Sequence, residues 1–436
     1  MKKIQAGLIG FGTIGAGVVK LLKKNAKLIE HKTGTKIVLK KIADLDITTD
    51  RGMQVKDGVL TTSVDDILND PSIDIVIELI GGYKPAKDFI LKAIKSGKHI
   101  VTANKALLAV HGDAIFSAAE KKGVHVGFEA AVCGGIPIIR TIKEGLCAEN
   151  ISSIYGIFNG TCNYILTKMT EEGKDFKEVL DDAQRLGYAE ADPTFDIDGI
   201  DAAHKLAILV ALSFGTKVDF QQIYTEGISR IAPIDIEFAN NLGYKIKLIA
   251  IAKRDKDSVE ARVHPTMLDA SHPLASVNDV FNAVYVNADA TGPTMYYGKG
   301  AGMMPTASAV MSDVIEIARN IDSGVLNRVP LLSFKDEFVK EIPIKPIGET
   351  ASKYYMRLSV KDQPKVLSQI SGILGDHKIS IESVIQKGKQ ALKSVSIVLQ
   401  THEALDSSVS AAIKEINGLS FVTDKTVIIR IEDLLK

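Results

Sequence analysis

The sequence predicts an α/β protein with a parallel-sheet domain, a second mixed α/β domain and a small C-terminal domain. Short apolar runs alternate with helical patterns from Lys3 to about Lys105, which is typical of βαβ units and a parallel sheet. From Tyr354 onward the pattern reads strand, helix, strand, strand, helix, strand, the order of a ferredoxin-like unit. The 436 residues also exceed what one hydrophobic core usually organises.

Loop signals and composition give the predicted boundaries. The segment after Gly127 mixes glycine-rich loops with helical stretches, and a proline-containing connector follows Pro330. We therefore expect a nucleotide-binding domain at 1–126, a substrate and dimerisation domain at 127–330 that can pack back on the first, a linker at 331–353 and a C-terminal domain at 354–436.

Charge and cysteine content exclude several classes of protein. Lysine and arginine number 53, as do aspartate and glutamate, so no net field favours nucleic acid or an anionic membrane. The three cysteines form no C-x-x-C pair, which indicates neither a disulfide framework nor a zinc site and fits a reducing cytoplasm. No stretch offers the roughly 20 uninterrupted apolar residues that a membrane span needs.

The first predicted strand, Ile4 to Ile9, leads into a glycine-rich turn and an amphipathic helix. Glycines at this place allow a tight turn and a close approach of the backbone, and the helix N-terminus attracts pyrophosphate. The sequence therefore predicts that NAD or NADP binds here, at Gly10, Phe11, Gly12, Thr13, Ile14 and Gly15.

The second predicted strand, Ile37 to Ala43, ends at Asp44, where an acidic residue would meet the adenosine ribose. Asp44 would favour NAD by accepting the 2′-hydroxyl and repelling a 2′-phosphate, but it could equally cap a turn. Lys40 and Lys41 nearby could still accommodate a phosphate, so the choice between NAD and NADP stays open.

Two further predicted strands, Ile73 to Ile80 and Ile100 to Ala103, end in segments that resemble paired signatures of homoserine dehydrogenases, and other blocks continue the resemblance in order. The segments are Glu78–Gly82, Val101–Ala106, Glu129–Pro137, Asn159–Tyr164, Gly187–Pro193, Asp201–Leu206 and Gly298–Gly302. The resemblance implies a Rossmann-type domain and the NAD(P)-dependent reduction of L-aspartate 4-semialdehyde to L-homoserine, in threonine, methionine and isoleucine biosynthesis. Leu45 stands where related sequences often carry an arginine for the NADP phosphate.

Asp201 and Lys205 lie four residues apart and so share one face of an apolar helix. An ordinary surface ion pair would explain them, but the apolar run after Lys205 predicts a buried helix, where an unneeded charge pair is costly. The resemblance implies that Lys205 gives its proton to the nascent alkoxide, that Asp201 and Glu190 hold the substrate and its ammonium group, and that Lys105 bridges cofactor and substrate. It also adds three residues to the cofactor site: Gly81, Gly187 and Gly302.

The segment Glu129 to Ile136 contains two glycines that free the backbone to turn its carbonyls toward a cation. The resemblance implies a monovalent ion, usually sodium, bound by Val132, Gly134 and Ile136 with a contribution from Glu129. Simple tight packing is the alternative, since oxygen-ligand sites have little sequence specificity.

The C-terminal segment Asp362 to Leu367 resembles the signature of ACT domains, with Lys365 in place of a common glycine. The resemblance implies amino-acid binding near Asp362 and Pro364, with threonine as the expected effector, and pairing of chains into a homodimer or homotetramer. Pairing without a ligand is the alternative. We also expect this tail to form an independent small core, so that a chain cut at about Gly348 would stay active.

Two other functions compete with this interpretation. Aspartate-semialdehyde dehydrogenase handles the same aldehyde but needs a cysteine nucleophile, for which Cys133 is a candidate, and a histidine base. A non-catalytic sensor of nucleotides and amino acids would use the same two kinds of domain without turnover. The sequence shows no DNA-binding helix pair that would support a repressor.

Overall fold

The computed structural model describes residues 2–326, 328–387 and 394–434. These residues form two compact units, which we describe separately. The first unit comprises 1–154, 201–221 and 281–342, and the second comprises 155–200, 222–280 and 343–436. The chain therefore passes between the units several times.

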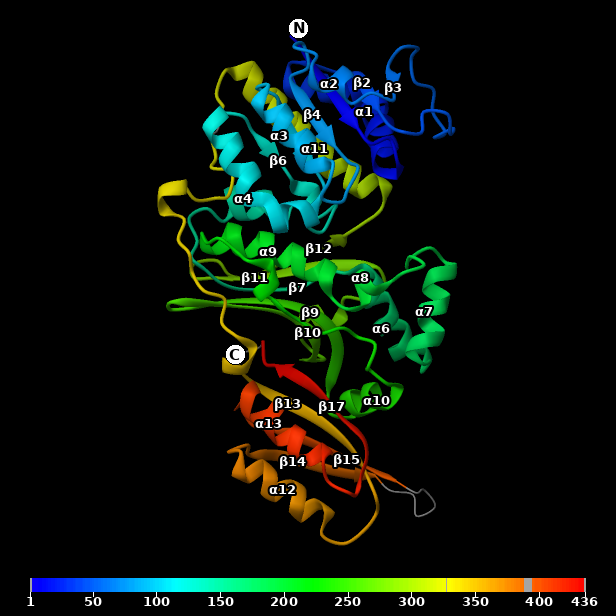
Figure 1. Cartoon of the computed structure of the whole chain (residues 1–436), viewed down its shortest axis with the longest axis vertical. Coiled ribbons are helices and arrows are strands. Elements are labelled where there is room, and N and C mark those ends of the chain that lie inside the picture. Colours follow the sequence, from blue (N-terminus) through cyan, green and yellow to red (C-terminus); the bar gives the residue numbers. More distant parts are fainter. Residues whose placement is uncertain (1, 327, 388–393, 435–436) are drawn as a thin grey trace. The chain divides into compact units, whose positions relative to one another are not determined.

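The first unit contains a six-stranded parallel sheet in the order β3-β2-β1-β4-β5-β6, the arrangement of dinucleotide-binding domains (Figure 1). The apolar runs of the sequence form its central strands. Its strands are β1 (Lys3–Ile9), β2 (Lys36–Ala43), β3 (Leu60–Thr61), β4 (Ile75–Glu78), β5 (His99–Thr102) and β6 (Val126–Gly127). The predicted strand at 73–80 is shorter in the structure, and no sequence pattern predicted β3 or β6, each of two residues.

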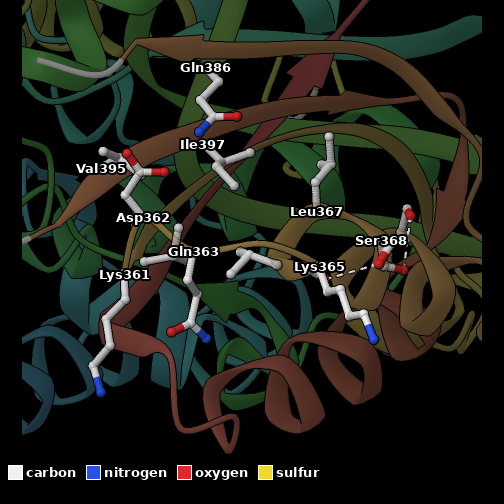
Figure 2. Close-up of a pocket in the computed structure, with 12 residues that line it drawn as sticks. Lys361, Asp362, Gln363, Lys365, Leu367, Ser368, Gln386, Val395 and Ile397 are labelled. Atoms are coloured by element: carbon white, nitrogen blue, oxygen red, sulfur yellow. Dashed lines mark hydrogen bonds between the residues drawn. The ribbon is translucent and has the colours of Figure 1, made fainter. Parts of the chain in front are cut away.

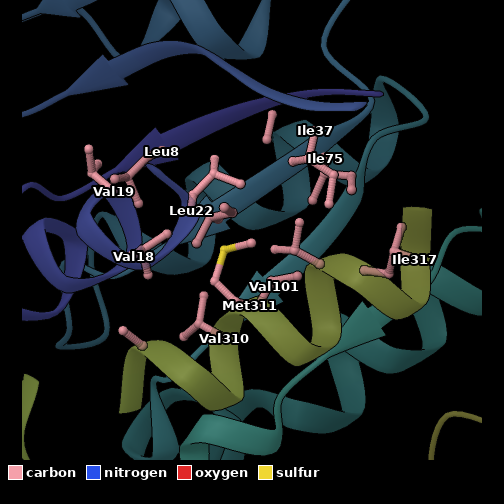
Figure 3. Packing of buried hydrophobic residues seen from close by; sticks show 14 of the residues in the cluster. Leu8, Val18, Val19, Leu22, Ile37, Ile75, Val101, Val310, Met311 and Ile317 are labelled. Atoms are coloured by element: carbon pink, nitrogen blue, oxygen red, sulfur yellow. The ribbon is translucent and has the colours of Figure 1, made fainter. Parts of the chain in front are cut away.

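One helix of the first unit, α11, comes from the later part of the sequence and packs on the nucleotide-binding sheet. Val310, Met311 and Ile317 of this late helix, α11, are buried in the same core as Leu8 and Val18 of the N-terminal segment (Figure 3). The helices are α1 (Thr13–Thr33), α2 (Asp65–Leu68), α3 (Ala86–Lys95), α4 (Lys105–Lys122), α5 (Ile138–Arg140), α9 (Ile200–Phe214) and α11 (Met303–Ser323), and a hairpin joins β11 (Phe281–Ala288) to β12 (Gly292–Lys299).

The second unit is built around the long antiparallel pair β9 (Tyr244–Asp255) and β10 (Ser258–Asp269). The short strand β8 (Tyr224–Thr225) runs parallel to β10. Strand β7 (Ile151–Ile157) spans the point where the chain passes from the first unit to the second. The helices before the C-terminal segment are α6 (Gly160–Glu172), α7 (Phe176–Arg185), α8 (Thr194–Ile197) and α10 (Pro233–Asn241).

The C-terminal segment has the predicted βαββαβ order. Its antiparallel sheet runs β17-β13-β15-β14, and α12 and α13 pack against it around a core of its own (Figure 1). The elements are β13 (Ala351–Val360), α12 (Val366–Asp376), β14 (Ile381–Lys387), β15 (Val395–Thr401), β16 (Ala404–Leu405), α13 (Asp406–Asn417) and β17 (Val422–Glu432). The sequence patterns located these strands and helices within a few residues.

The C-terminal segment is not free of the rest of the second unit. Strand β17 pairs in parallel with β10, at Thr266 to Leu268 opposite Arg430 to Glu432. The Arg262 side chain, 1% exposed, forms an ion pair with Glu432 at the end of β17. The tail thus has its own core, as expected. Its strand β17 also pairs with β10, and its Glu432 pairs with the Arg262 side chain of β10. No described helix is long and apolar enough to cross a membrane.

Candidate active site

The glycine-rich turn joins β1 to α1, and its glycines differ in what surrounds them. Gly10 has a φ of +99°, and a Cβ there would lie 2.8 Å from the backbone of Leu79. A Cβ on Gly15 would lie 2.1 Å from the Gly10 carbonyl oxygen, whereas no described heavy atom lies within 4 Å of the position for Gly12. Gly10 and Gly15 thus allow close packing, and Gly12 leaves the backbone open to a pyrophosphate at the start of α1.

Asp44 directly follows β2, and both of its carboxylate oxygens accept backbone N–H groups. One oxygen accepts from Phe11 in the glycine-rich turn and the other from Asp46, at 2.9 Å in the latter case. Leu45, beside it, is 94% exposed. Asp44 therefore caps the turn after β2. Its bond to Phe11 also fixes the glycine-rich turn that would hold the pyrophosphate.

The two lysines that could accommodate a 2′-phosphate bind other groups. The Lys40 ammonium lies 2.7 Å from a carboxylate oxygen of Asp70. The Lys41 ammonium donates to the Gly58 carbonyl at 2.7 Å. Either lysine would have to leave these partners before it could bind a phosphate.

We expect Asp44→Ala to shift cofactor preference toward NADPH. The change removes a carboxylate that repels a 2′-phosphate, and a repulsion of about 1 kcal/mol in water corresponds to roughly fivefold in affinity. The measurement is the ratio of kcat/KM with NADPH and NADH. Asp46→Ala is the matched control, because the Asp46 carboxylate binds Thr48 and Thr49 of its own turn. An unchanged ratio in Asp44→Ala would leave capping as its role.

Helix α9 carries two charged residues in a largely apolar sequence, and it is buried over almost its whole length. The Lys205 ammonium lies 2.7 Å from one oxygen of the Asp201 carboxylate. The ammonium of Lys105, the first residue of α4, lies 2.8 Å from the other oxygen. One carboxylate therefore holds two ammonium groups that come from different helices.

This cluster carries two positive charges and one negative charge. Asp201 is 3% exposed and Lys205 8%, which does not fit an ordinary surface pair. Burial alone would raise the pKa of Asp201, but Lys205 and Lys105 hold it well below its ordinary value, so the carboxylate is ionised. The side chain of Lys105 is 35% exposed and gives the cluster an open side. Such a cluster can donate a proton to an oxygen that gains negative charge.

The neighbouring His204 has a different environment. Its ring stacks on Phe220 with 4.0 Å between the ring centroids. Burial lowers the pKa of His204 to about 4, so its imidazole is neutral at pH 7. It therefore adds no charge to the cluster.

Cys133 is the candidate nucleophile of the cysteine-dependent alternative, and its surroundings do not suit that role. The residue is fully buried, and burial raises the pKa of its thiol to about 11. A nucleophilic cysteine needs its thiolate form and some exposure. The structure thus provides no activated cysteine at this position.

The candidate cation loop has an unusual backbone. Cys133 and Gly134 both have positive φ values, and a Cβ on Gly134 would lie 2.5 Å from the Gly300 carbonyl oxygen. Among the described residues, no backbone N–H donates to the carbonyl of Val132 or Gly134, whereas that of Ile138 donates to the Ile136 carbonyl. Carbonyls without a backbone donor, in a turned backbone, fit a monovalent cation.

The Glu129 carboxylate has other partners than the carbonyls of this loop. Its two oxygens accept the N–H groups of Ile139 and Arg140 in α5, each at 2.9 Å. Its own N–H donates to Asp313 of α11. Burial and the nearby Glu129 raise the pKa of Asp313 to about 8. Sequence reasoning missed Asp313, because a single carboxylate within a long helix carries no local signal.

Two of the predicted site residues lie in the second unit. Gly187 follows α7 with a φ of +77°, and both Gly187 and Glu190 are exposed. The Gln184 amide donates to the Glu190 carbonyl at 2.9 Å, which ties this loop to the end of α7. The first unit therefore brings together Lys105, Asp201 and Lys205, and the remaining substrate residue belongs to a different compact unit.

A pocket of about 570 Å³ opens in the C-terminal domain at the start of α12 (Figure 2). Asp362, Gln363 and Lys365 line it from the loop after β13, and Gln386 lines it from β14. Pro364 lies in the same loop but is not among the lining residues. The pocket offers both carboxylate and amide groups, the kind of lining that binds a small polar molecule.

Lys365 has a φ of +73°, a conformation that explains why glycine is common at this place. We expect Lys365→Gly to raise the free energy of unfolding by about 1 kcal/mol, because a non-glycine residue in the left-handed region costs about that much. Urea denaturation measures the change. Lys361→Gly, at the same pocket and without a positive φ, is the control and should be destabilising. A destabilised Lys365→Gly variant would show that the lysine side chain outweighs the strain.

Comparisons with known proteins give matches to three family models, which together span most of the chain. Residues 10–129 match the family model of the homoserine dehydrogenase NAD-binding domain, 137–315 match that of homoserine dehydrogenase, and 354–420 match that of the ACT domain. The homoserine dehydrogenase of Pseudomonas aeruginosa is 46% identical, with 100% of both chains covered. The chain belongs to the homoserine dehydrogenase family.

Solved structures of the family support the same conclusion. A homoserine dehydrogenase from Thiobacillus denitrificans is 47% identical and has a TM-score of 0.94, with 99% of each chain covered. A hyperthermophilic archaeal homoserine dehydrogenase mutant, solved with NADPH, is 27% identical with a TM-score of 0.62, over 72% of this chain and 97% of that one. The family resemblance and the fold class predicted from sequence are thus confirmed, including an NAD(P)-binding domain and an ACT domain.

Proposed function

We propose that the protein reduces L-aspartate 4-semialdehyde to L-homoserine with NADH or NADPH, and also catalyses the reverse reaction. The observation that carries this proposal is the buried cluster of Lys105, Asp201 and Lys205 beside a dinucleotide-binding sheet. Reduction of an aldehyde produces an alkoxide, which needs an acid and no covalent nucleophile. The cluster supplies an acid, and Cys133 is unsuited to the alternative chemistry.

The residues of the glycine-rich turn and Asp44 would hold the dinucleotide, with Gly81, Gly187 and Gly302 at other parts of it. The nicotinamide, when bound, supplies a hydride to the aldehyde carbon. Lys205 gives a proton from its ammonium group to the aldehyde oxygen, so the carbonyl becomes a hydroxyl. Asp201 keeps the two lysines in place and, with Glu190, receives the substrate ammonium group, while Lys105 bridges cofactor and substrate.

A monovalent cation, with sodium as the expected ion, would bind the carbonyls of Val132, Gly134 and Ile136. Glu129 would contribute a further oxygen ligand. The cation would fix the loop that packs against Gly300.

Threonine is the effector that we propose for the ACT pocket, since homoserine leads to threonine. Asp362 could bind an ammonium group and the amides could bind a carboxylate. The edge strand β14 would allow two chains to pair into a homodimer or a larger assembly. Because the three cysteines are free, we still expect the protein to be located in the cytoplasm.

The test is consumption of NADH or NADPH in the presence of aspartate semialdehyde, followed by the ultraviolet absorbance of the reduced nicotinamide, with and without threonine. Consumption of NADH or NADPH that depends on the aldehyde supports the proposal. Binding of nucleotide without turnover would favour a sensor instead. Turnover that does not respond to threonine would remove the proposed effector but not the reaction.

A further inference from the structure

A buried carboxylate near the proposed site has no part in the chemistry described so far. Glu78 is the last residue of β4, and its side chain is fully buried. One carboxylate oxygen accepts the N–H groups of Ile80 at 2.9 Å and Gly81 at 3.2 Å. The other accepts the hydroxyl of Thr102 at 2.6 Å. Because it is closed off from solvent, this carboxylate can act only through the groups that it binds.

Thr102 continues the connection into the next loop. It ends β5, directly opposite Glu78 in the parallel pair, and its hydroxyl oxygen accepts the N–H of Asn104 at 3.0 Å. The Asn104 amide donates to the Gly82 carbonyl at 2.7 Å, and its oxygen caps α4 by accepting the N–H of Leu107. Glu78, Thr102 and Asn104 thus join the loop after β4 to the first turn of α4. We refer to these three residues as the loop ring.

The chemistry of the loop ring requires a carboxylate at position 78. Three donors converge on Glu78, and an ionised carboxylate accepts at both of its oxygens, whereas glutamine would direct an NH₂ donor toward one of them. Burial of a carboxylate is costly, and no described cation lies within ion-pair distance of Glu78. If Glu78 served only to stabilise the end of the sheet, a neutral acceptor could bind the same three donors. This points to a function for the geometry that the ring imposes.

The helix that begins at the loop ring presents Lys105. Asn104 is the N-cap of α4 and Lys105 is its first residue, so the ring fixes the backbone from which the Lys105 ammonium reaches Asp201 at 2.8 Å. We propose that Glu78 is a positioning residue of the reaction, which holds the start of α4, and with it Lys105, in place through Thr102 and Asn104. This inference rests on the role proposed above for Lys105.

The experiment is a double-mutant cycle with Glu78→Gln and Lys105→Ala. Misplacement of a group that binds cofactor and substrate by about 1 Å costs of order 10²-fold, so we expect Glu78→Gln to lower kcat/KM by about 10-fold to 10²-fold. In the Lys105→Ala background the same change should have an effect within about twofold, because the group that it positions is gone. The Kd of NADPH, from its fluorescence on binding, should show the same non-additivity without turnover.

A matched pair at Thr102 separates positioning from folding. Thr102→Ser keeps the hydroxyl and should retain activity, whereas Thr102→Val has nearly the same volume without it and should reproduce the Glu78→Gln loss. All variants are compared by thermal unfolding. Additive losses in the cycle, or a fully active Thr102→Val, would overturn the inference. Normal kinetics in Lys105→Ala alone would instead refute the role proposed for Lys105, and the inference with it.

Discussion

Replacement of Lys205 by alanine is expected to lower turnover by a factor of order 10² to 10⁴, the usual contribution of a general acid. The ammonium of Lys205 lies against an ionised carboxylate in a buried helix, where a proton can be held for transfer. Affinity for NADPH should stay nearly unchanged, because Lys205 acts on the substrate oxygen. Asp201 keeps Lys105 as a partner, so the variant retains a compensated buried charge.

The measurement is steady-state kinetics together with the Kd of NADPH and a thermal unfolding curve. Lys217→Ala is the matched control, since Lys217 follows the same helix but is exposed and lies 3.6 Å from Glu341 in an exposed ion pair. It should keep normal turnover. A folded Lys205→Ala variant with near-normal turnover would remove Lys205 from the mechanism.

A chain truncated after Glu349 is expected to be much less stable than the intact chain, contrary to the independence that the sequence suggested for the tail. Truncation removes β17 from the edge of β10 and one of the two carboxylates that pair with the buried Arg262. It also removes Arg357, which binds the fully buried Asp235 through two nitrogens, at 2.6 and 3.0 Å. A buried charge left without its partner costs about 3–5 kcal/mol.

Soluble yield and thermal unfolding of the truncated chain test this expectation. Arg357→Ala, in the full-length chain, isolates the loss at Asp235 and should lower stability by a similar 3–5 kcal/mol. Lys361→Ala, at the surface of the same domain, is the control and should change stability little. A truncated chain that unfolds at the temperature of the intact one would mean that the tail is energetically separate after all.

Local patterns predicted most of the fold. The strand and helix periods located β1, β2 and the six main elements of the tail, because each of these buries one apolar face and ends at a turn signal. The pairing of β17 with β10 had no such signal. It depends on contacts between Glu432 and Arg262, which are far apart in sequence, and no periodicity encodes a contact at that range.

The site was predicted in part. The spacing of Asp201 and Lys205 placed both on one helix face, and the apolar run predicted their burial. The contact of Lys105 with Asp201 did not follow from sequence spacing, since it joins two helices. The loop ring was also missed, because Glu78 reads as the end of an apolar strand and only its three donors reveal that it is a buried acceptor.

Transfer of deuterium from the cofactor to the product distinguishes catalysed reduction from binding of the nucleotide alone. The protein is incubated with aspartate semialdehyde and NADPH or NADH that carries deuterium at the transferable position, and the amino acids formed are analysed by mass spectrometry. We expect homoserine with a single deuterium on its hydroxymethyl carbon, in an amount equal to the cofactor oxidised, and a yield that falls with Lys205→Ala. Homoserine without deuterium, or cofactor bound with no product formed, would contradict it.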